Sequence, residues 1–150
     1  MLRICVLLFG CLALLAAADQ GVRVQFIGGT LAAIPAKSTI RIDVTGYDTL
    51  VFHAGKSDLQ IPYTKINVIE YGQHVSRRYA AAVLISPMLL LSKSRKHFIT
   101  LEYRDSDGKQ QALVLRAEKG DIRGLLAALE ARTGRRIEFQ DDEARKAGRG

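Results

Sequence analysis

The chain has 150 residues, a length that suits one domain with a sizeable buried core. Its 22 Lys and Arg residues exceed its 15 Asp and Glu residues, so the formal net charge is +7 at pH 7. This charge keeps a small protein soluble, and it also suits contact with anionic lipid, acidic glycans or an acidic protein. Both cysteines, Cys5 and Cys11, lie near the N-terminus, so the rest of the chain has no disulfide, thiolate nucleophile or Cys-ligated metal.

Residues 1–18 have the pattern of a cleavable export signal. A short cationic start at Met1-Leu2-Arg3 precedes an almost continuous apolar run from Ile4 to Leu15, and Ala16-Ala17-Ala18 fits a small-x-small cleavage site. The apolar run is shorter than the roughly 20 residues of a membrane-spanning helix. We therefore predict cleavage after Ala18 and a periplasmic or extracellular mature protein, for which nucleic acid is not an expected partner.

Lipidation at Cys11 is the alternative processing route. Leu8-Phe9-Gly10-Cys11 loosely resembles a lipobox, but Phe9 is bulky where a small residue is usual. The apolar run also continues past Cys11, whereas a lipoprotein signal ends its apolar region there. We therefore do not expect a lipoprotein.

The central part of the chain has the period-two alternation of strands with one buried face. Gly28-Gly29 is expected to end the first strand, and Pro62 with a phase slip near Lys65 indicates a bent pair of strands, or one strand with a bulge, in the fourth segment. The turn composition of residues 45–48 predicts a hairpin between the second and third segments. The expected strands are Val22–Phe26, Ile40–Val44, Thr49–His53, Leu59–Tyr71, Phe98–Arg104 and Gln110–Arg116.

The turn Asp105-Ser106-Asp107-Gly108 joins the last two of these strands. Asp-x-Asp-Gly is found in calcium-binding loops, but the acidic twelfth position of an EF-hand is occupied here by Arg116. We therefore predict a hairpin turn and no metal site.

One amphipathic helix is predicted over Asp121–Thr133, where Ile122, Leu125, Leu126 and Leu129 form an apolar stripe. Gly134 follows at the position of a left-handed cap. A short strand at Ile137–Phe139 comes next, and residues 140–150 are charged and small and are expected to be a disordered tail. The predicted organisation is a signal peptide at 1–18, a single domain at 19–139 and a tail at 140–150.

The order of these elements resembles the pleckstrin-homology-like (PH-like) roll. The segment Leu59-Gln60-Ile61-Pro62-Tyr63-Thr64-Lys65-Ile66-Asn67-Val68-Ile69-Glu70-Tyr71 is similar to the Ile-Pro-hydroxyl-Lys-Ile-x-x-Val/Ile-Glu stretch of bacterial members. The chain is also similar to uncharacterised exported proteins of soil bacteria with an Ile-Pro-Tyr…Glu-Tyr-Gly run and a Leu-Glu-Ala-Arg-Thr-Gly helix. The resemblance implies a mainly β fold, an antiparallel roll or barrel of about six or seven strands closed by one C-terminal helix, and binding rather than catalysis.

A second apolar run, residues 80–91, is the predicted binding site. Twelve residues of helix reach roughly 18 Å, too short for a bilayer, and Pro87 would interrupt a helix. The run is either buried structure or an exposed apolar contact for a membrane or partner, with cationic flanks that meet phosphates. The candidate binding residues are Arg77, Arg78, Leu84, Ile85, Met88, Leu89, Leu90, Lys93, Arg95 and Lys96.

Catalytic motifs are absent from the sequence. His53, His74 and His97 are isolated and lack metal-ligand spacing, Glu70 has no predictable second carboxylate, and there is no nucleophile elbow or P-loop. We expect no cofactor, and a non-catalytic binding or scaffolding module at the cell envelope, in contact with an anionic membrane surface or an envelope protein. The alternatives are a structural protein that docks a partner without lipid affinity, and a hydrolase of unseen type.

Overall fold

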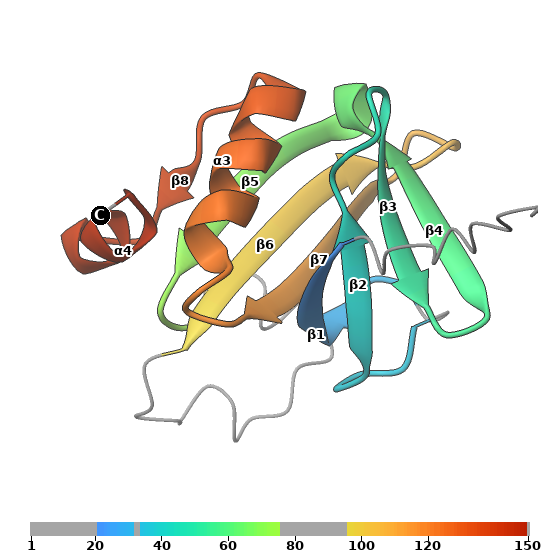
Figure 1. Cartoon of the computed structure of the whole chain (residues 1–150). Helices are drawn as coiled ribbons and strands as arrows, with labels where there is room; N and C mark the ends of the chain where they lie inside the picture. The colour runs from blue at the N-terminus through green and yellow to red at the C-terminus, as the bar shows by residue number, and fades with distance from the viewer. Residues whose placement is uncertain (1–20, 32–33, 76–95, 150) are drawn as a thin grey trace, which may run out of the picture.

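A computed structural model describes residues 21–31, 34–75 and 96–149 (Figure 1). The predicted signal at 1–18 and the apolar run at 80–91 lie outside these residues. The elements in chain order are β1 (Val22–Gly29), β2 (Thr39–Asp43), β3 (Thr49–Ala54), β4 (Ser57–Pro62), the 3-10 turn η1 (Tyr63–Lys65), β5 (Ile66–Gly72), β6 (His97–Arg104), β7 (Gln110–Ala117), α3 (Ile122–Thr133), β8 (Glu138–Phe139) and α4 (Asp142–Arg149).

The strands form one sheet in the order β4-β3-β2-β1-β7-β6-β5-β8. All neighbours are antiparallel except β5 and β8, which pair in parallel. The expected mainly β fold with a C-terminal helix is confirmed, but the sheet has eight strands and is open, with β4 and β8 at its two edges. β4 and β5 follow each other in the chain but are separated by η1 and do not pair, and α3 lies over the β5 and β6 side of the sheet (Figure 1).

The segment Leu59–Tyr71 is a bent pair of strands, one of the two predicted arrangements. Pro62 has no backbone N–H for a central ladder, and it ends β4 and caps η1. The 3-10 turn then changes the chain direction before β5 starts at Ile66. Buried Tyr63, in the turn, keeps this corner attached to the core.

β1 runs through Gly28 and Gly29, so the prediction that these glycines end the strand was wrong. Its register against β7 shifts between Phe26 and Gly28, which accommodates the glycines within the strand as an irregularity. An added Cβ at Gly29 would lie 2.7 Å from the carbonyl oxygen of Ala112. Glycine is therefore required at this position by the close approach of β7.

The core lies between the sheet and α3. Leu125, Leu126 and Leu129 are buried, as the apolar stripe predicted, and belong to a core cluster that includes residues from both halves of the sheet. Gly134 ends α3 in the left-handed conformation with φ of 66°, also as predicted. Asp121 precedes the helix but makes no side-chain capping hydrogen bond.

A second, smaller apolar cluster lies on the other face of the sheet. Because side chains alternate along a strand, Leu113 and Leu115 face the main core while Ala112 and Val114 face away from it. The members of this cluster are Ile27, Val75, Phe98, Ala112 and Val114. Val75 and Phe98 belong to the chain on either side of residues 76–95, so this face lies where that segment leaves and re-enters the fold.

Residues 142–149, which the sequence placed in a disordered tail, form the helix α4. Ala144 is fully buried and Gly148 is buried, so the helix packs through its small residues. The Asp141 carboxylate accepts a hydrogen bond from the Ala144 N–H at 2.6 Å and so caps the first turn. The Arg149 guanidinium lies 5.2 Å from the centre of the Phe139 ring. Composition suggested disorder because alanine and glycine supply little apolar surface, whereas here they allow close packing.

Candidate functional site

A surface hollow of about 530 Å³ lies between the start of β6, the N-terminal end of α3 and α4. This volume is within the range of small-molecule sites, about 300–1,000 Å³. The lining residues are Gln73, His97, Lys119, Arg123, Glu143, Lys146 and Ala147. Most of these side chains are polar or charged, so the hollow suits a polar ligand better than an apolar one.

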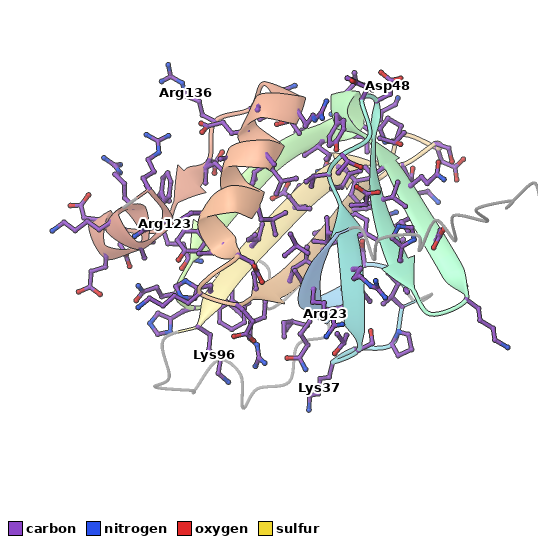
Figure 2. The ribbon with its side chains drawn as sticks, in the orientation of Figure 1. Arg23, Lys37, Asp48, Lys96, Arg123 and Arg136 are labelled. Carbon is purple, nitrogen blue, oxygen red and sulfur yellow. The ribbon has the colours of Figure 1, made fainter. Side chains whose placement is uncertain are left out.

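The backbone brings the ends of the undescribed segment 76–95 to this hollow. Gln73 follows β5 and Lys96 precedes β6, and the N–H of Lys96 donates to the carbonyl of Gln73 at 3.4 Å. Figure 2 shows Lys96 beside the start of β6 and Arg123 on the side of α3 toward α4. The chain therefore leaves and re-enters the domain at the rim of the hollow.

His97 forms the inner wall of the hollow together with Tyr71 behind it. The Tyr71 hydroxyl and His97 Nδ1 are 2.5 Å apart, and the two rings are nearly parallel with centres 6.0 Å apart. Burial and then the positive charge of Lys119 lower the pKa of His97 from 6.5, while Glu118 opposes them. Burial raises the pKa of the Tyr71 hydroxyl above 10.0. Both groups are therefore uncharged at neutral pH, and only Nε2 of His97 remains for a ligand.

Three basic residues surround the hollow. Lys119 comes from the β7–α3 connection, Arg123 from the first turn of α3, and Lys146 from α4. Arg123 Nε donates to the carbonyl of Ala147 at 3.4 Å, which joins α3 to α4 and orients the guanidinium. Glu143 adds one negative charge to the same wall. With neutral His97, the lining has a net positive charge, which attracts anions.

Of the binding residues predicted from the sequence, Lys96 is the one that the structure describes. Lys96 lies next to His97 at the rim, while Arg77, Arg78, Leu84, Ile85, Met88, Leu89, Leu90, Lys93 and Arg95 lie outside the described residues. The residues that line the hollow were missed because they come from four separated parts of the chain. The available signal was the basic residues at element ends, Lys119 before the helix and Lys96 before a strand.

Two other polar side chains that the sequence offered for catalysis, His53 and Glu70, have structural partners. His53 Nδ1 and the Asp58 carboxylate oxygen Oδ1 lie within hydrogen-bonding distance, 2.9 Å, across the β3–β4 hairpin. Buried Glu70 accepts from the Gln140 side chain at 2.9 Å, and Gln140 also donates to the carbonyl of His74. Asp105 accepts from the N–H groups of Asp107 and Lys109, which confirms the predicted hairpin turn.

Metal-binding clusters and membrane-spanning helices are both absent from the described residues. These residues contain no group of three or more His, Cys, Asp or Glu side chains placed to hold a metal ion. Within the same part of the chain, no helix combines the length and apolar character needed to cross a membrane. The basic hollow is thus the described feature with the clearest binding chemistry.

Comparison with known proteins finds no matching family model and no matching curated relative.

Proposed function

We propose that this protein is an exported, non-catalytic binding module with a PH-like fold that contacts an anionic membrane surface at the cell envelope. The observation that carries the proposal is the position of the basic hollow. Gln73 and Lys96 are hydrogen bonded at its rim, and the apolar run 80–91 lies between them in the sequence. The proposal pairs this cationic hollow with the apolar run, because basic and apolar groups together suit a lipid interface.

The electrostatic contribution is large enough to matter. Each basic residue near an anionic membrane contributes about 1 kcal/mol. Lys119, Arg123 and Lys146 surround the hollow and Lys96 lies at its rim, so their joint contribution is several kcal/mol at low salt. Exposed charges are screened over about 8–10 Å near physiological ionic strength, so the attraction should weaken as salt is added.

The N-terminal sequence and the order of the strands support the other parts of the proposal. The cationic, apolar and small-residue order of residues 1–18 supports export. The seven strands described before α3, together with the Ile-Pro-Tyr-Thr-Lys-Ile segment at the β4–β5 corner, support the PH-like fold. Fold analogy alone does not define a ligand, so the ligand class is argued from the hollow.

Sedimentation with lipid vesicles tests the proposal. The mature protein should pellet with phosphatidylglycerol vesicles and not with neutral phosphatidylcholine vesicles, and binding should fall as salt rises. Lys119→Glu, at the hollow, should weaken pelleting more than Lys56→Glu, the same charge change at the exposed β3–β4 turn. No pelleting with anionic vesicles at low salt would refute membrane contact. It would leave the partner-docking module and the hydrolase as the remaining functions.

A paired leucine substitution tests the apolar run. Loss of vesicle binding by the Leu89→Asp, Leu90→Asp double variant, with an unchanged circular dichroism spectrum, would support a contact role. An unfolded double variant would instead assign the run to the core, because buried unpaired carboxylates are costly.

A further inference from the structure

The basic hollow has the charge and donor pattern of a specific anion site. We propose that it binds a terminal phosphate group, as found in phosphate monoesters and inorganic phosphate. This inference rests on the proposed function, because it names the chemical group that the same hollow recognises on an anionic surface.

The charge of the lining matches a phosphate dianion. Lys119, Arg123 and Lys146 supply three positive charges, and Glu143 supplies one negative charge. A terminal phosphate carries about −1.5 to −2 charges at pH 7. A phosphodiester carries a single charge, so it would neutralise less of the hollow and have fewer oxygens for its donors. The hollow should therefore discriminate in favour of monoesters.

The donors come from three sides of the hollow. The Nε of Arg123 is held by the carbonyl of Ala147, so its terminal nitrogens remain to donate in the planar arrangement that suits phosphate oxygens. Nδ1 of His97 is engaged with Tyr71, so Nε2 is the ring nitrogen left for a ligand. When the Tyr71 hydroxyl donates to Nδ1, Nε2 carries its hydrogen and is itself a donor.

Lys119 and Lys146 both line the hollow and have no competing partner among the described residues. Lys119 lines the hollow together with His97, and its positive charge lowers the pKa of the His97 ring. Within the described part of the chain, no hydrogen bond or ion pair joins the side chain of Lys119 or Lys146 to another residue. Like charges gathered in this way repel one another, and a bound dianion would relieve that repulsion.

A titration followed by ¹H–¹⁵N NMR tests the site directly. Inorganic phosphate at pH 7.5 and constant ionic strength should give saturable shifts at the amides of His97, Lys119, Arg123 and Lys146. Dimethyl phosphate, which has the charge of a diester, should bind more weakly. The absence of saturable shifts at the hollow, or equal binding of the two compounds, would overturn the proposal.

Charge variants identify the groups responsible. Lys119→Gln and Lys146→Gln should each weaken phosphate binding about fivefold, which corresponds to about 1 kcal/mol per basic residue. Glu143→Gln should strengthen it, because it removes the one negative charge of the lining. Lys56→Gln, the matched control at the distant turn, should leave the dissociation constant unchanged. Equal effects of Lys56→Gln and Lys119→Gln would mean that phosphate binds through general surface charge, and this result would overturn the proposed site.

Binding to vesicles of two compositions distinguishes the phosphate site from the proposed membrane contact. At equal surface charge, vesicles with phosphatidic acid, whose phosphate is terminal, should bind the protein more tightly than vesicles with phosphatidylglycerol. Equal binding to both, with no saturable phosphate titration, would refute the site while leaving membrane contact supported. Saturable binding of free phosphate with no binding to either vesicle would support the site as one for a soluble phosphate compound and refute the membrane function.

Discussion

Gly148→Ala tests whether α4 is packed as described. An added Cβ at Gly148 would lie 2.8 Å from Cε1 of Phe139 and 3.2 Å from side-chain carbons of Leu126 and Tyr71. A contact under 3.0 Å forces a shift, and overpacking of this kind costs about 1–3 kcal/mol. The crevice of about 250 Å³ beside Gly148 gives α4 some room to move, which favours the lower half of that range.

Helix propensity acts in the opposite direction. Alanine is favoured over glycine by about 1 kcal/mol inside a helix, and by less at the penultimate residue of α4. The steric cost is therefore larger, and we expect Gly148→Ala to destabilise the docked helix by about 1 kcal/mol. Gly124→Ala in α3 is the matched control, because nothing lies within 4 Å of its added Cβ. It should stabilise the protein by about 0.5–1 kcal/mol.

Two measurements cover the two ways in which α4 can respond. Denaturant midpoints at constant slope report a change in global stability. Because a short C-terminal helix can detach before the domain unfolds, the rate of trypsin cleavage after Arg145 and Lys146 reports local opening. Gly148→Ala should lower the midpoint or speed this cleavage, and Gly124→Ala should do neither. Stabilisation of equal size by both alanines, with unchanged cleavage, would refute the packing of α4 on Tyr71 and Phe139.

Three further predictions follow from buried groups. Leu129 is fully buried in the core, so Leu129→Ala should lower the free energy of unfolding by about 2–5 kcal/mol, and a change inside ±0.5 kcal/mol would mean that α3 is not docked. The buried Tyr63 hydroxyl has no hydrogen-bond partner among the described residues, so Tyr63→Phe should stabilise the protein by about 1 kcal/mol; a clear loss of stability would reveal a partner. The pKa of His97 is lowered in the folded state. Between that lowered pKa and 6.5, the unfolded chain binds more protons than the folded protein, so the free energy of unfolding decreases as the pH falls below 6.5. Urea melts at pH 5 and pH 8 should therefore show a smaller acid loss for His97→Asn than for the unchanged protein, and equal losses would contradict the burial of the imidazole.

The sequence predicted the strands where alternation is regular. Thr49–His53, Phe98–Arg104 and Gln110–Arg116 match β3, β6 and β7 closely, because apolar residues recur at every second position on one face in the middle of each strand. The stripe of α3 and its Gly134 cap were visible for the same reason. The pairing of β1 with β7 could not be predicted, because it joins residues about 90 positions apart and depends on a register shift at Gly28.

The residues that line the hollow could not be predicted from the sequence for a related reason. His97 and Lys146 come together only because α4 folds back on α3 and β8 adds in parallel to β5. α4 itself was not predicted, since Ala144 and Gly148 provide close approach rather than a recognisable apolar stripe. Lys96 was selected for its position beside the apolar run, and its place at the rim follows from the backbone hydrogen bond to Gln73.

The two edges of the sheet have unequal protection against association with another chain. At one edge, β4 ends in Pro62, which has no N–H to offer, and exposes the charged Asp58. At the other edge, β5 has no such feature, and it is covered instead by β8 and by the hydrogen bond from the Gln140 N–H to the carbonyl of Tyr71. The C-terminal residues therefore cover the edge of β5. A chain that ended at Ile137 would leave the backbone of β5 free to pair with a strand of another molecule. Proteolytic loss of the C-terminus would then convert a protected edge into a site of self-association.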